Sequence, residues 1–412
     1  MTYCVRQLTG TQERFEFARI ASSAYPGFGR SPRENAEAVE ELAAEPTNTF
    51  WGCFEGDRLL GGMRRLDLSM NYCGEFIDAG GLGFVAVGLG DKRRGVARSM
   101  VRSFLEHCQA QGIGMTLLYP FRPDFYHGMG FGFGQEGRLF ALKPQALPHR
   151  VSPHAVRRLT DDDVNALGRC YRDFAVAHHG YCHKTCRELN ALFGAKGLYG
   201  YETEAGLEGY VAFDFARAHH ANALKNDLVI REWVWHNPRA FLALSSFLHS
   251  QRDQVDRVLF ATQQSDFQFL SADPRNATDN MFNKHYHECY TGGVGLMYRM
   301  TSLPLLVKAI AHRNFNDMNC QLTVRVRDSF CPEHSGVYSL RFVEGRLCEA
   351  GEGVPSAIAI ELDVAELSSL FMGSVEFSTL YRLGKVQVEP EAVNRLSRLF
   401  WYPMRPECVT SF

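Results

Sequence analysis

The sequence predicts a mixed α/β (α+β) protein built from three successive blocks, each with a mixed sheet or a small set of strands. Amphipathic helical segments alternate with short apolar runs along the first two blocks. In each of these blocks a strand, a helix and a strand follow one another, which indicates a βαβ unit in a mixed central sheet. In the third block alternating strands precede two short helices, as in a small α+β domain.

Composition narrows the class of protein. The 412 residues carry a net charge of −2, with 45% apolar and 22% charged residues, as in an ordinary globular protein. Nothing in the near-neutral balance points to nucleic acid or an anionic membrane as the main partner, and we predict no nucleic-acid partner. We find no secretory signal and no apolar run of about 18 residues, so we predict a cytoplasmic chain without a membrane span, and release from cells stays open. The 12 scattered cysteines are typical of reduced thiols.

The first predicted domain covers residues 1–150. Two apolar runs around Glu55-Gly56-Asp57 predict a hairpin. Three prolines within 141–156 fix φ and remove backbone donors, which predicts a boundary there. Further helices are expected at 12–24, 32–45 and 94–111, and strands at 80–87 and 115–119.

The second predicted domain, 151–293, repeats the order of the first and is interpreted as a degenerate copy of it. Its expected elements are a helix at 161–193, strands at 207–215 and 227–235, a helix at 238–251 and a strand at 257–261. The third, 294–412, is expected to carry helices at 303–313, 364–371 and 390–400 and strands within 321–329, 336–350 and 356–363.

A cluster of metal-ligand side chains lies within nine residues of the second block, formed by His178, His179, Cys182, His183 and Cys186. Several of these could coordinate zinc. No second CxxC or HxxxH half accompanies them, and the surrounding segment is predicted to be helical. We therefore interpret them as ordinary residues on a helix face and predict no metal.

The stretch FVAVGLGDKRRGVARSMVR, Phe84–Arg102, carries the clearest chemical signal. A strand enters a basic glycine turn, and an amphipathic helix follows. The start of a helix offers free N–H groups and a positive dipole, and glycine lets a phosphate approach closely. The apolar stripe of the helix is Val96, Met100, Val101 and Phe104. The basic residues of the turn and first helical turn are Lys92, Arg93, Arg94 and Arg98. Such a segment suits a pyrophosphate.

Spacing alone leaves alternatives for this turn. A GxGxxG dinucleotide fingerprint fails, because Gly88 and Gly90 lie too far before Gly95 and no acidic residue follows about 20 positions later. A P-loop fails because GK[ST] is missing. A basic helix start on a solvated surface, without any ligand, fits the spacing as well as an anion site does.

The segment Lys92-Arg93-Arg94-Gly95-Val96-Ala97 resembles the R/Q-x-x-G-x-G/A pyrophosphate loop of the GCN5-related N-acetyltransferases (GNAT). Lys stands for Arg or Gln, and Ala for Gly. The resemblance implies acetyl-CoA as co-substrate, and a strand that splays from its neighbour so that its free backbone pairs with the pantetheine arm. The coenzyme-binding residues it implies are Val85, Ala86, Val87, Arg93, Arg94, Gly95, Val96, Ala97, Arg98, Phe121 and Arg122.

A second segment, LLYPFRPDFYHGMGFGFG at Leu117–Gly134, resembles the Eis (enhanced intracellular survival) family through its phrase FY-x-x-x-G-F-G. That family has a catalytic GNAT domain, a GNAT-like domain without coenzyme and a sterol-carrier-like C-terminal domain. The resemblance therefore implies tandem GNAT-like domains followed by a sterol-carrier-like α+β domain, assembled as a homohexamer. The second block offers only Asn237-Pro238 where the first has its basic turn, as expected of a copy without coenzyme.

The resemblance also implies direct attack of an amine on the thioester. Tyr126 stands where the family has its general acid, and a tyrosine is protonated at neutral pH. The carboxylate of the last residue, Phe412, stands where the family has its base. By proximity alone, Glu75, Asp78 and Asp124 are also candidate bases. Backbone N–H groups of the strand before the turn are expected to hold the oxyanion.

The acceptor implied by the resemblance is a primary amine of a polycationic small molecule such as an aminoglycoside, acetylated at one or several positions, or a lysine side chain. A spacious pocket lined by aromatic rings and carboxylates would suit it. Phe28 and Phe84 are candidate substrate-binding residues, and Trp51 is a further candidate for the wall.

Two other functions stay open. The third block could belong to a lipid-binding, sterol-carrier-like protein whose GNAT blocks are relics, although a relic should have lost the basic turn. A tandem-GNAT acyltransferase with a longer acyl donor would share the first two blocks and need not carry the third.

Overall fold

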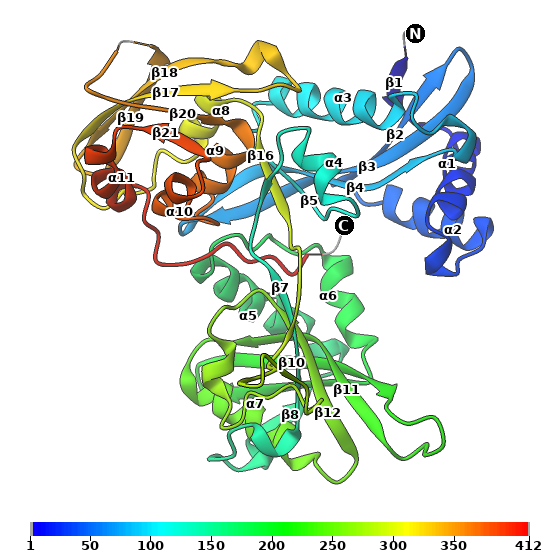
Figure 1. Ribbon diagram of the computed structural model, residues 1–412. Helices are drawn as coiled ribbons and strands as arrows, with labels where there is room; N and C mark the ends of the chain where they lie inside the picture. The colour runs from blue at the N-terminus through cyan, green and yellow to red at the C-terminus, as the bar shows by residue number, and fades with distance from the viewer. Residues whose placement is uncertain (1–2, 354, 411–412) are drawn as a thin grey trace. The chain divides into compact units, whose positions relative to one another are not determined.

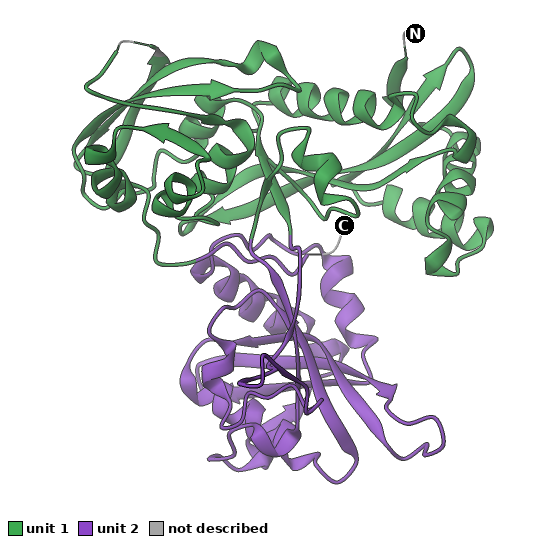
Figure 2. Cartoon of the chain, in the orientation of Figure 1, with its two compact units in different colours: residues 1–134, 296–404, 411–412 green, residues 135–295, 405–410 purple. Residues whose placement is uncertain are grey.

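The computed structural model describes residues 3–353 and 355–410 and consists of mixed sheets flanked by helices (Figure 1). The predicted mixed α/β class is confirmed. The chain divides into two compact units, one containing 3–134 and 296–404 and the other 135–295 and 405–410 (Figure 2). None of the helices in the described part of the chain has the length and apolarity needed to cross a bilayer. All 12 cysteines are free thiols.

The first unit is built on a seven-stranded sheet in the order β1-β2-β3-β4-β5-β16-β6. Its strands are β1 (Cys4–Gln7), β2 (Asn48–Glu55), β3 (Arg58–Tyr72), β4 (Glu75–Val87), β5 (Met115–Leu118), β6 (Gly132–Phe133) and β16 (Met297–Met300). The hairpin predicted around Glu55-Gly56-Asp57 joins β2 to β3. β4 and β5 run parallel and are connected by α3 (Val96–Ala110), so the predicted βαβ unit is confirmed.

Helices pack on this sheet as the sequence pattern requires. The four residues of the stripe predicted on α3 are all buried in the core cluster under that helix. α1 (Thr11–Ala24) and α2 (Pro32–Ala43) pack together beside β2 and β4, and the short α4 (Pro123–His127) follows β5. Ser31 caps α2 in a capping box with Glu34, and Pro32 occupies the first turn. Such a cap stabilises a helix by about 1 kcal/mol.

A five-stranded sheet in the order β19-β18-β17-β20-β21 forms the rest of the first unit. Its strands are β17 (Cys320–Arg327), β18 (Gly336–Val343), β19 (Arg346–Glu352), β20 (Ile358–Asp363) and β21 (Val386–Val388). Its helices are α8 (Leu303–Ala309), α9 (Val364–Phe371), α10 (Phe377–Arg382) and α11 (Val393–Leu399). The prediction of a small α+β block is confirmed.

The second unit repeats the topology of the first, with a sheet in the order β15-β7-β12-β11-β10-β9-β8. The parallel pair β11 and β12 is connected by α7, as β4 and β5 are by α3. Its strands are β7 (Gly137–Leu142), β8 (Val156–Arg158), β9 (Gly197–Thr203), β10 (Gly206–Arg217), β11 (Asn226–Trp235), β12 (Val255–Thr262) and β15 (Thr291–Gly293), beside a hairpin of β13 (Met281–Phe282) and β14 (Tyr286–His287). Its helices are α5 (Val164–Ala177), α6 (Cys186–Phe193) and α7 (Pro238–Ser250).

Two strands pair far from their neighbours in sequence. β7 lies before the predicted boundary near residue 150, and it pairs with β12 and β15 in the second sheet. β16 lies after the predicted boundary at 293, and it pairs with β5 and β6 in the first sheet. Each sheet is therefore completed by a strand that follows or precedes it at a distance along the chain.

The single helix expected over 161–193 is wrong. The structure has a helical turn at Asp161–Asp163, then α5, a loop, and α6, which begins with a capping box at Thr185. Gly180 breaks the helix with φ of +93°, and a Cβ there would lie 2.6 Å from the carbonyl oxygen of Glu407. A distant part of the chain therefore packs against this break, where a side chain would not fit.

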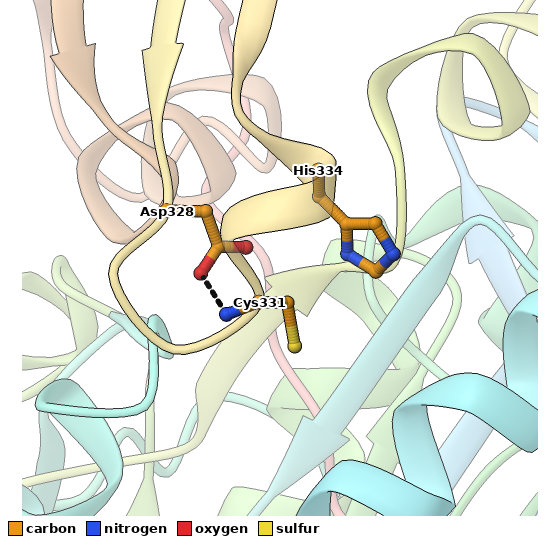
Figure 3. A group of neighbouring side chains, drawn as sticks. All are labelled: Asp328, Cys331 and His334. Atoms are coloured by element: carbon orange, nitrogen blue, oxygen red, sulfur yellow. Dashed lines mark hydrogen bonds between the residues drawn. The ribbon is translucent and has the colours of Figure 1, made fainter.

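The loop after β17 is closed by the carboxylate of Asp328 (Figure 3). One of its oxygens accepts hydrogen bonds from the N–H groups of Phe330 at 3.1 Å and Cys331 at 2.9 Å. The N–H of Asp328 itself donates to the Ser335 hydroxyl at 2.9 Å. The carboxylate thus fixes the turn that returns the chain towards β18.

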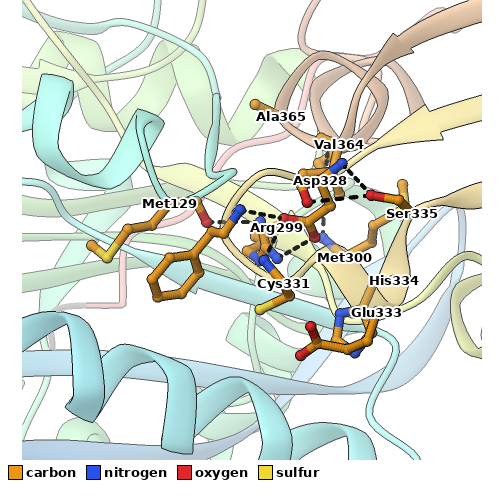
Figure 4. Close-up of polar contacts among 12 residues, drawn as sticks. Met129, Arg299, Met300, Asp328, Cys331, Glu333, His334, Ser335, Val364 and Ala365 are labelled. Carbon is orange, nitrogen blue, oxygen red and sulfur yellow. Dashed lines mark hydrogen bonds and ion pairs between the residues drawn. The ribbon is translucent and has the colours of Figure 1, made fainter.

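The second oxygen of Asp328 pairs with Arg299 of β16 (Figure 4). Arg299 Nη2 lies 2.5 Å from Asp328 Oδ2, and Nη1 donates to the carbonyl of Met129 at 2.7 Å. The two side chains are 0% and 1% exposed. Gly130 leaves room for the guanidinium, because a Cβ there would lie 1.5 Å from Arg299 Nη1. The pair ties the loop after α4, the strand β16 and the third block together.

We expect Arg299→Met to lower the free energy of unfolding by about 3–5 kcal/mol, because it leaves the Asp328 carboxylate buried without its counter-charge. Asp328→Asn should have a similar effect, and the double variant should cost less than the sum of both. Urea unfolding measures these changes. Arg33→Met is the control, since that side chain is 87% exposed. Strictly additive losses would contradict a coupled pair.

Candidate active site

A bulge in β4 opens the first sheet beside the predicted glycine turn. Phe84 has φ of +51°, and the register between β3 and β4 shifts between Gly62 and Arg64. The pairing of β4 with β5 extends from Ala79 to Leu82 and stops there. Beyond that point the segment 83–87 pairs, among the described strands, with β3 alone, as the splayed strand of the prediction requires. The hydroxyl of Tyr25 donates to the Val85 carbonyl at 2.5 Å.

The N-terminus of α3 is open. Gly95 precedes the helix with φ of +85°, and Arg93 also adopts a left-handed conformation with φ of +63°. No side chain accepts a hydrogen bond from the first turn of the helix within the described residues. Uncapped N–H groups and the positive end of the helix dipole form an anion site.

A cavity of about 600 Å³ begins at this helix start and runs along β4. Nine of the eleven residues predicted to bind coenzyme line it: Val85, Val87, Arg93, Gly95, Val96, Ala97, Arg98, Phe121 and Arg122. Lys92, Arg93 and Arg98 are exposed and bring three positive charges to the anion site. The cavity therefore has the charge and backbone donors that suit a pyrophosphate with an extended arm.

The other two predicted residues do not line the cavity. Ala86 is 1% exposed and packs into the core under α1. Arg94 donates instead to Asp91 at 2.7 Å and to Glu55 at 2.6 Å, which holds the turn in place. Burial raises the pKa of Asp91, but hydrogen bonds from Arg58 and Arg94 outweigh it and hold the pKa below its usual value. Arg94 is thus a residue that shapes the loop.

A second cavity, of about 630 Å³, lies between α2 and β4. Both predicted substrate residues, Phe28 and Phe84, line it. Four residues line both cavities: Tyr25, Val85, Phe121 and Tyr126. The two cavities therefore meet at the bulge of β4, with a tyrosine from the end of α1 and one from α4 at the junction. Trp51 lines neither, because it packs against His107 and the core under α3.

Tyr126 is held at this junction by aromatic packing. Its ring is 3% exposed and lies 5.3 Å from Phe125, 6.0 Å from Phe131 and 6.4 Å from Phe121 between centroids. Within the described chain, no residue forms a hydrogen bond with its hydroxyl. Burial, helped by the nearby Tyr25, raises the pKa of Tyr126 well above its ordinary value. The hydroxyl is therefore protonated at neutral pH and available to an atom in the cavities.

Tyr25 is a site residue that the sequence analysis missed. Burial raises its pKa to about 12, and its hydroxyl is already used by the Val85 carbonyl. Its role is thus to hold the bulged strand. No motif surrounds it, since it follows α1 and precedes only the turn Pro26–Phe28, so no local signal could have found it.

The candidate bases lie elsewhere or outside the described residues. Asp124 pairs with Arg122 at 2.5 Å, and Glu75 lies 3.5 Å from His312. Asp78 is exposed on β4. None of these three lines either cavity among the described residues. Phe412, whose carboxylate the family resemblance implies as base, lies outside the described residues.

The corresponding helix of the second unit, α7, has a capped start, in contrast to the open start of α3 in the first unit. At α7 the side chain of Asn237 accepts hydrogen bonds from the N–H groups of Arg239 and Ala240, both at 3.0 Å. Pro238 has no N–H, and the carboxylate of Glu208 lies 2.9 Å from the Asn237 amide. A phosphate would meet satisfied donors and a negative charge there.

Possible metal ligands converge at one place in the described chain, at Asp328, Cys331 and His334. The Asp328 carboxylate is already bonded to Arg299 and two backbone N–H groups, so a cation would have to displace a buried guanidinium. The buried ion pair with Arg299 accounts for the position of the Asp328 carboxylate. The side chains of the His178–Cys186 cluster do not converge in this way: His178 stacks on Phe174, and the Cys182 carbonyl accepts from Tyr171.

Models of known families match three segments of the chain. Residues 5–134 match an acetyltransferase (GNAT) domain, 187–290 match a second acetyltransferase (GNAT) domain, and 306–409 match a sterol carrier protein domain. Among curated proteins, no sequence matches the chain.

Solved structures share the whole fold. A GCN5-related N-acetyltransferase from Anabaena variabilis gives a TM-score of 0.83 at 17% identity, with 100% of both chains covered. Eis1 from Mycobacterium abscessus gives 0.77 at 19% identity, again with 100% of both chains covered. A GCN5-related N-acetyltransferase from Kribbella flavida gives 0.75 at 19% identity, covering 99% of this chain and 100% of that one. The predicted fold of two GNAT-like domains and a sterol-carrier-like domain is confirmed.

Proposed function

We propose that this chain, a GNAT acetyltransferase with an Eis-like fold, transfers the acetyl group of acetyl-CoA to a primary amine in its first GNAT domain. The meeting of the two cavities at Tyr126 carries the proposal. A coenzyme bound along the first cavity, with its pyrophosphate at Gly95, would present its thioester at the junction. An amine would enter through the second cavity.

In the proposed reaction the amine nitrogen attacks the thioester carbonyl, the C–S bond breaks, and the leaving thiolate receives a proton. Tyr126 is the proposed donor, because both cavities reach it and burial, which raises its pKa, keeps its hydroxyl protonated. Backbone N–H groups of the bulged segment Val85–Val87 are the proposed donors to the oxyanion.

The proposed base is the terminal carboxylate of Phe412. An α-carboxyl group has a pKa of about 3.3–3.7 and is ionised at neutral pH. Within the second unit, Glu407 donates its N–H to the His179 carbonyl at 2.8 Å, and Cys408 donates its N–H to Gln263 Oε1 at 2.7 Å. The chain is thus anchored shortly before its last residue.

The other two candidate functions have weaker support. A lipid-binding protein with relic GNAT domains would have no need of the open, basic start of α3. A longer acyl donor differs from acetyl-CoA only beyond the thioester, so it shares every contact described above and is distinguished by competition between acyl chains. The domain boundaries at 150 and 293 and the homohexamer stay predictions.

Tyr126→Phe should lower turnover by about 10²-fold or more while leaving coenzyme affinity unchanged, because it removes the proton donor and keeps the ring. Free-thiol release from acetyl-CoA with an amine acceptor measures turnover. Since the pKa of Tyr126 is raised, its hydroxyl stays protonated, and wild-type activity should not fall between neutral pH and the ordinary tyrosine value of 10.0. Tyr201→Phe, at a buried tyrosine outside both cavities, is the control. Equal turnover in Tyr126→Phe would remove this residue from the mechanism.

Gly95→Asp should abolish measurable binding of coenzyme A in calorimetry, because a carboxylate at the helix start repels the pyrophosphate. Gly112→Asp is the matched control at the other end of α3. Both glycines have positive φ, +85° and +77°, and open space around a Cβ, so both variants carry the same backbone strain. Normal binding by Gly95→Asp would place the pyrophosphate elsewhere.

Extending the chain beyond Phe412 by a few neutral residues should lower turnover by about 10²-fold, because the carboxylate is displaced. The melting temperature should stay the same. The same residues added at the N-terminus serve as the control, and full activity with the C-terminal extension would exclude the terminal carboxylate as base.

A further inference from the structure

The second cavity, which we proposed as the entrance of the amine, has a largely apolar wall. Most of its lining residues are aromatic or aliphatic, and within the described residues no aspartate or glutamate lines it. The pocket expected for a polycationic acceptor has aromatic rings and carboxylates. The described residues supply the rings and none of the carboxylates, so a second ammonium group of an acceptor finds no counter-charge among them.

Helix α2 turns one stripe of side chains towards this cavity. Asn35, Ala38, Val39 and Leu42 recur at the three- and four-residue spacing of one helix face, and all four line the cavity. Three of them are apolar, as expected of a face that packs on a sheet. The fourth, Asn35, is 4% exposed, so an amide stands where an apolar side chain is expected. Burial of an amide costs free energy unless its polar atoms find partners.

One side of the Asn35 amide has a partner in the protein. Its Nδ2 donates to the Ser22 hydroxyl of α1 at 2.8 Å, and that hydroxyl donates in turn to the Ala18 carbonyl at 2.9 Å. A serine hydroxyl has a single hydrogen, so it accepts from Asn35, and this contact fixes which way the amide faces. The amide oxygen, Oδ1, forms no hydrogen bond with any described residue. A buried acceptor without a partner is suited to a donor on a ligand.

Asn35 and Tyr126 line the same cavity and offer opposite chemistry. Tyr126, at the junction with the first cavity, offers a hydroxyl proton, and Asn35, on α2, offers an acceptor oxygen. Arg30 and Arg64 line the cavity as well. Arg30 is exposed at the rim, and Arg64 Nε donates to Asn48 Oδ1 at 2.8 Å, so we assign no ligand to either.

Stacked rings form the part of the wall on which the body of a ligand would rest. Tyr25 lies 5.6 Å from Phe28 and 5.7 Å from Phe84 between centroids, with interplanar angles of 23° and 15°. Rings in this arrangement present flat apolar faces, and an aromatic or apolar body covers such faces well. A polar group on that body would be removed from water, so it needs a hydrogen-bond partner in the protein.

We propose that the acceptor is a primary amine on a flat apolar body that also carries a neutral hydrogen-bond donor, a hydroxyl or an amide N–H, which donates to Asn35 Oδ1. This inference rests on the proposed acetyl transfer and gives the class of its acceptor. A fixed, buried oxygen discriminates between acceptors, because one that lacks the donor leaves this oxygen without a partner. Asn35 is thus a specificity residue and takes no part in the bond changes.

Acceptors that share one ring and one amine test the proposal: 3- and 4-(aminomethyl)phenol, 3- and 4-methoxybenzylamine, and benzylamine. The methoxy compounds keep the oxygen and lack the donor. We expect kcat/KM for the better phenol to exceed the values for its methoxy counterpart and for benzylamine by about fivefold, after correction for the free-amine fraction. Thiol release from acetyl-CoA measures it. Equal values for phenol and methoxy compound, or a preference for the methoxy compound, would overturn the proposal.

Substitution of Asn35 identifies the residue. Asn35→Leu should lower the phenol-to-methoxy ratio of kcat/KM to about one, because it removes the acceptor. Asn35→Asp keeps an oxygen at the same place and should retain most of the ratio. Ser23→Ala, at an exposed hydroxyl next to Ser22 that donates to the Arg19 carbonyl, is the control and should leave the ratio unchanged. A wild-type ratio in Asn35→Leu would exclude Asn35 as the acceptor.

A lysine peptide assayed beside these amines separates this inference from the function on which it rests. If the peptide releases thiol and none of the ring amines does, the acetyl transfer stands and the inferred acceptor class is wrong. If neither the peptide nor any ring amine releases thiol, the proposed transfer itself is wrong, and the acceptor class falls with it.

Discussion

The buried pair between Arg299 and Asp328 is the constraint on which the arrangement of the first unit depends. Two charges removed from water cost several kcal/mol each unless they meet one another and further hydrogen-bond partners. Arg299 finds Asp328 and the Met129 carbonyl, and the N–H of Met129 in turn donates to the Tyr126 carbonyl at 2.9 Å. The turn that positions the proposed acid is therefore held from the third block, through a strand that lies between β5 and β6. The sterol-carrier-like part of the chain thus contributes to the position of the proposed acid.

The two GNAT-like domains share one topology and differ in whether the start of the corresponding helix is open to an anion. Both have a parallel strand pair joined by a helix, in the same place of the sheet. In the first, Gly95 leaves the helix start uncapped and basic residues surround it. In the second, Asn237 satisfies the same N–H groups and Glu208 adds a negative charge beside them. The difference lies in whether the protein itself accepts hydrogen bonds from the first N–H groups of the helix or leaves them to a ligand.

Much of the fold could be predicted from local pattern, because the strands and helices show their periodicity within short segments and the glycine turn is a short motif. The open turn at Gly95 and the ring of Tyr126 lie on such segments. The rest depends on contacts between distant residues. Glu407 packs against Gly180 in the break between α5 and α6, and β7 and β16 pair with strands that lie far from them in sequence. Tyr25, Arg30 and Arg64 reach the cavities from the end of α1, a turn and β3, and no spacing in the sequence relates them.

The late strand β16 has a consequence for biosynthesis. Until Met300 leaves the ribosome, β5 is an edge strand, because its partner is made ~180 residues after Leu118. At about 5–20 residues per second, the apolar segment Met115–Leu118 waits roughly ten seconds or more for its neighbour. An unpaired, buried-type strand is a template for wrong pairing during that time. The nascent first domain therefore passes through an interval of this length with the β5 edge unpaired.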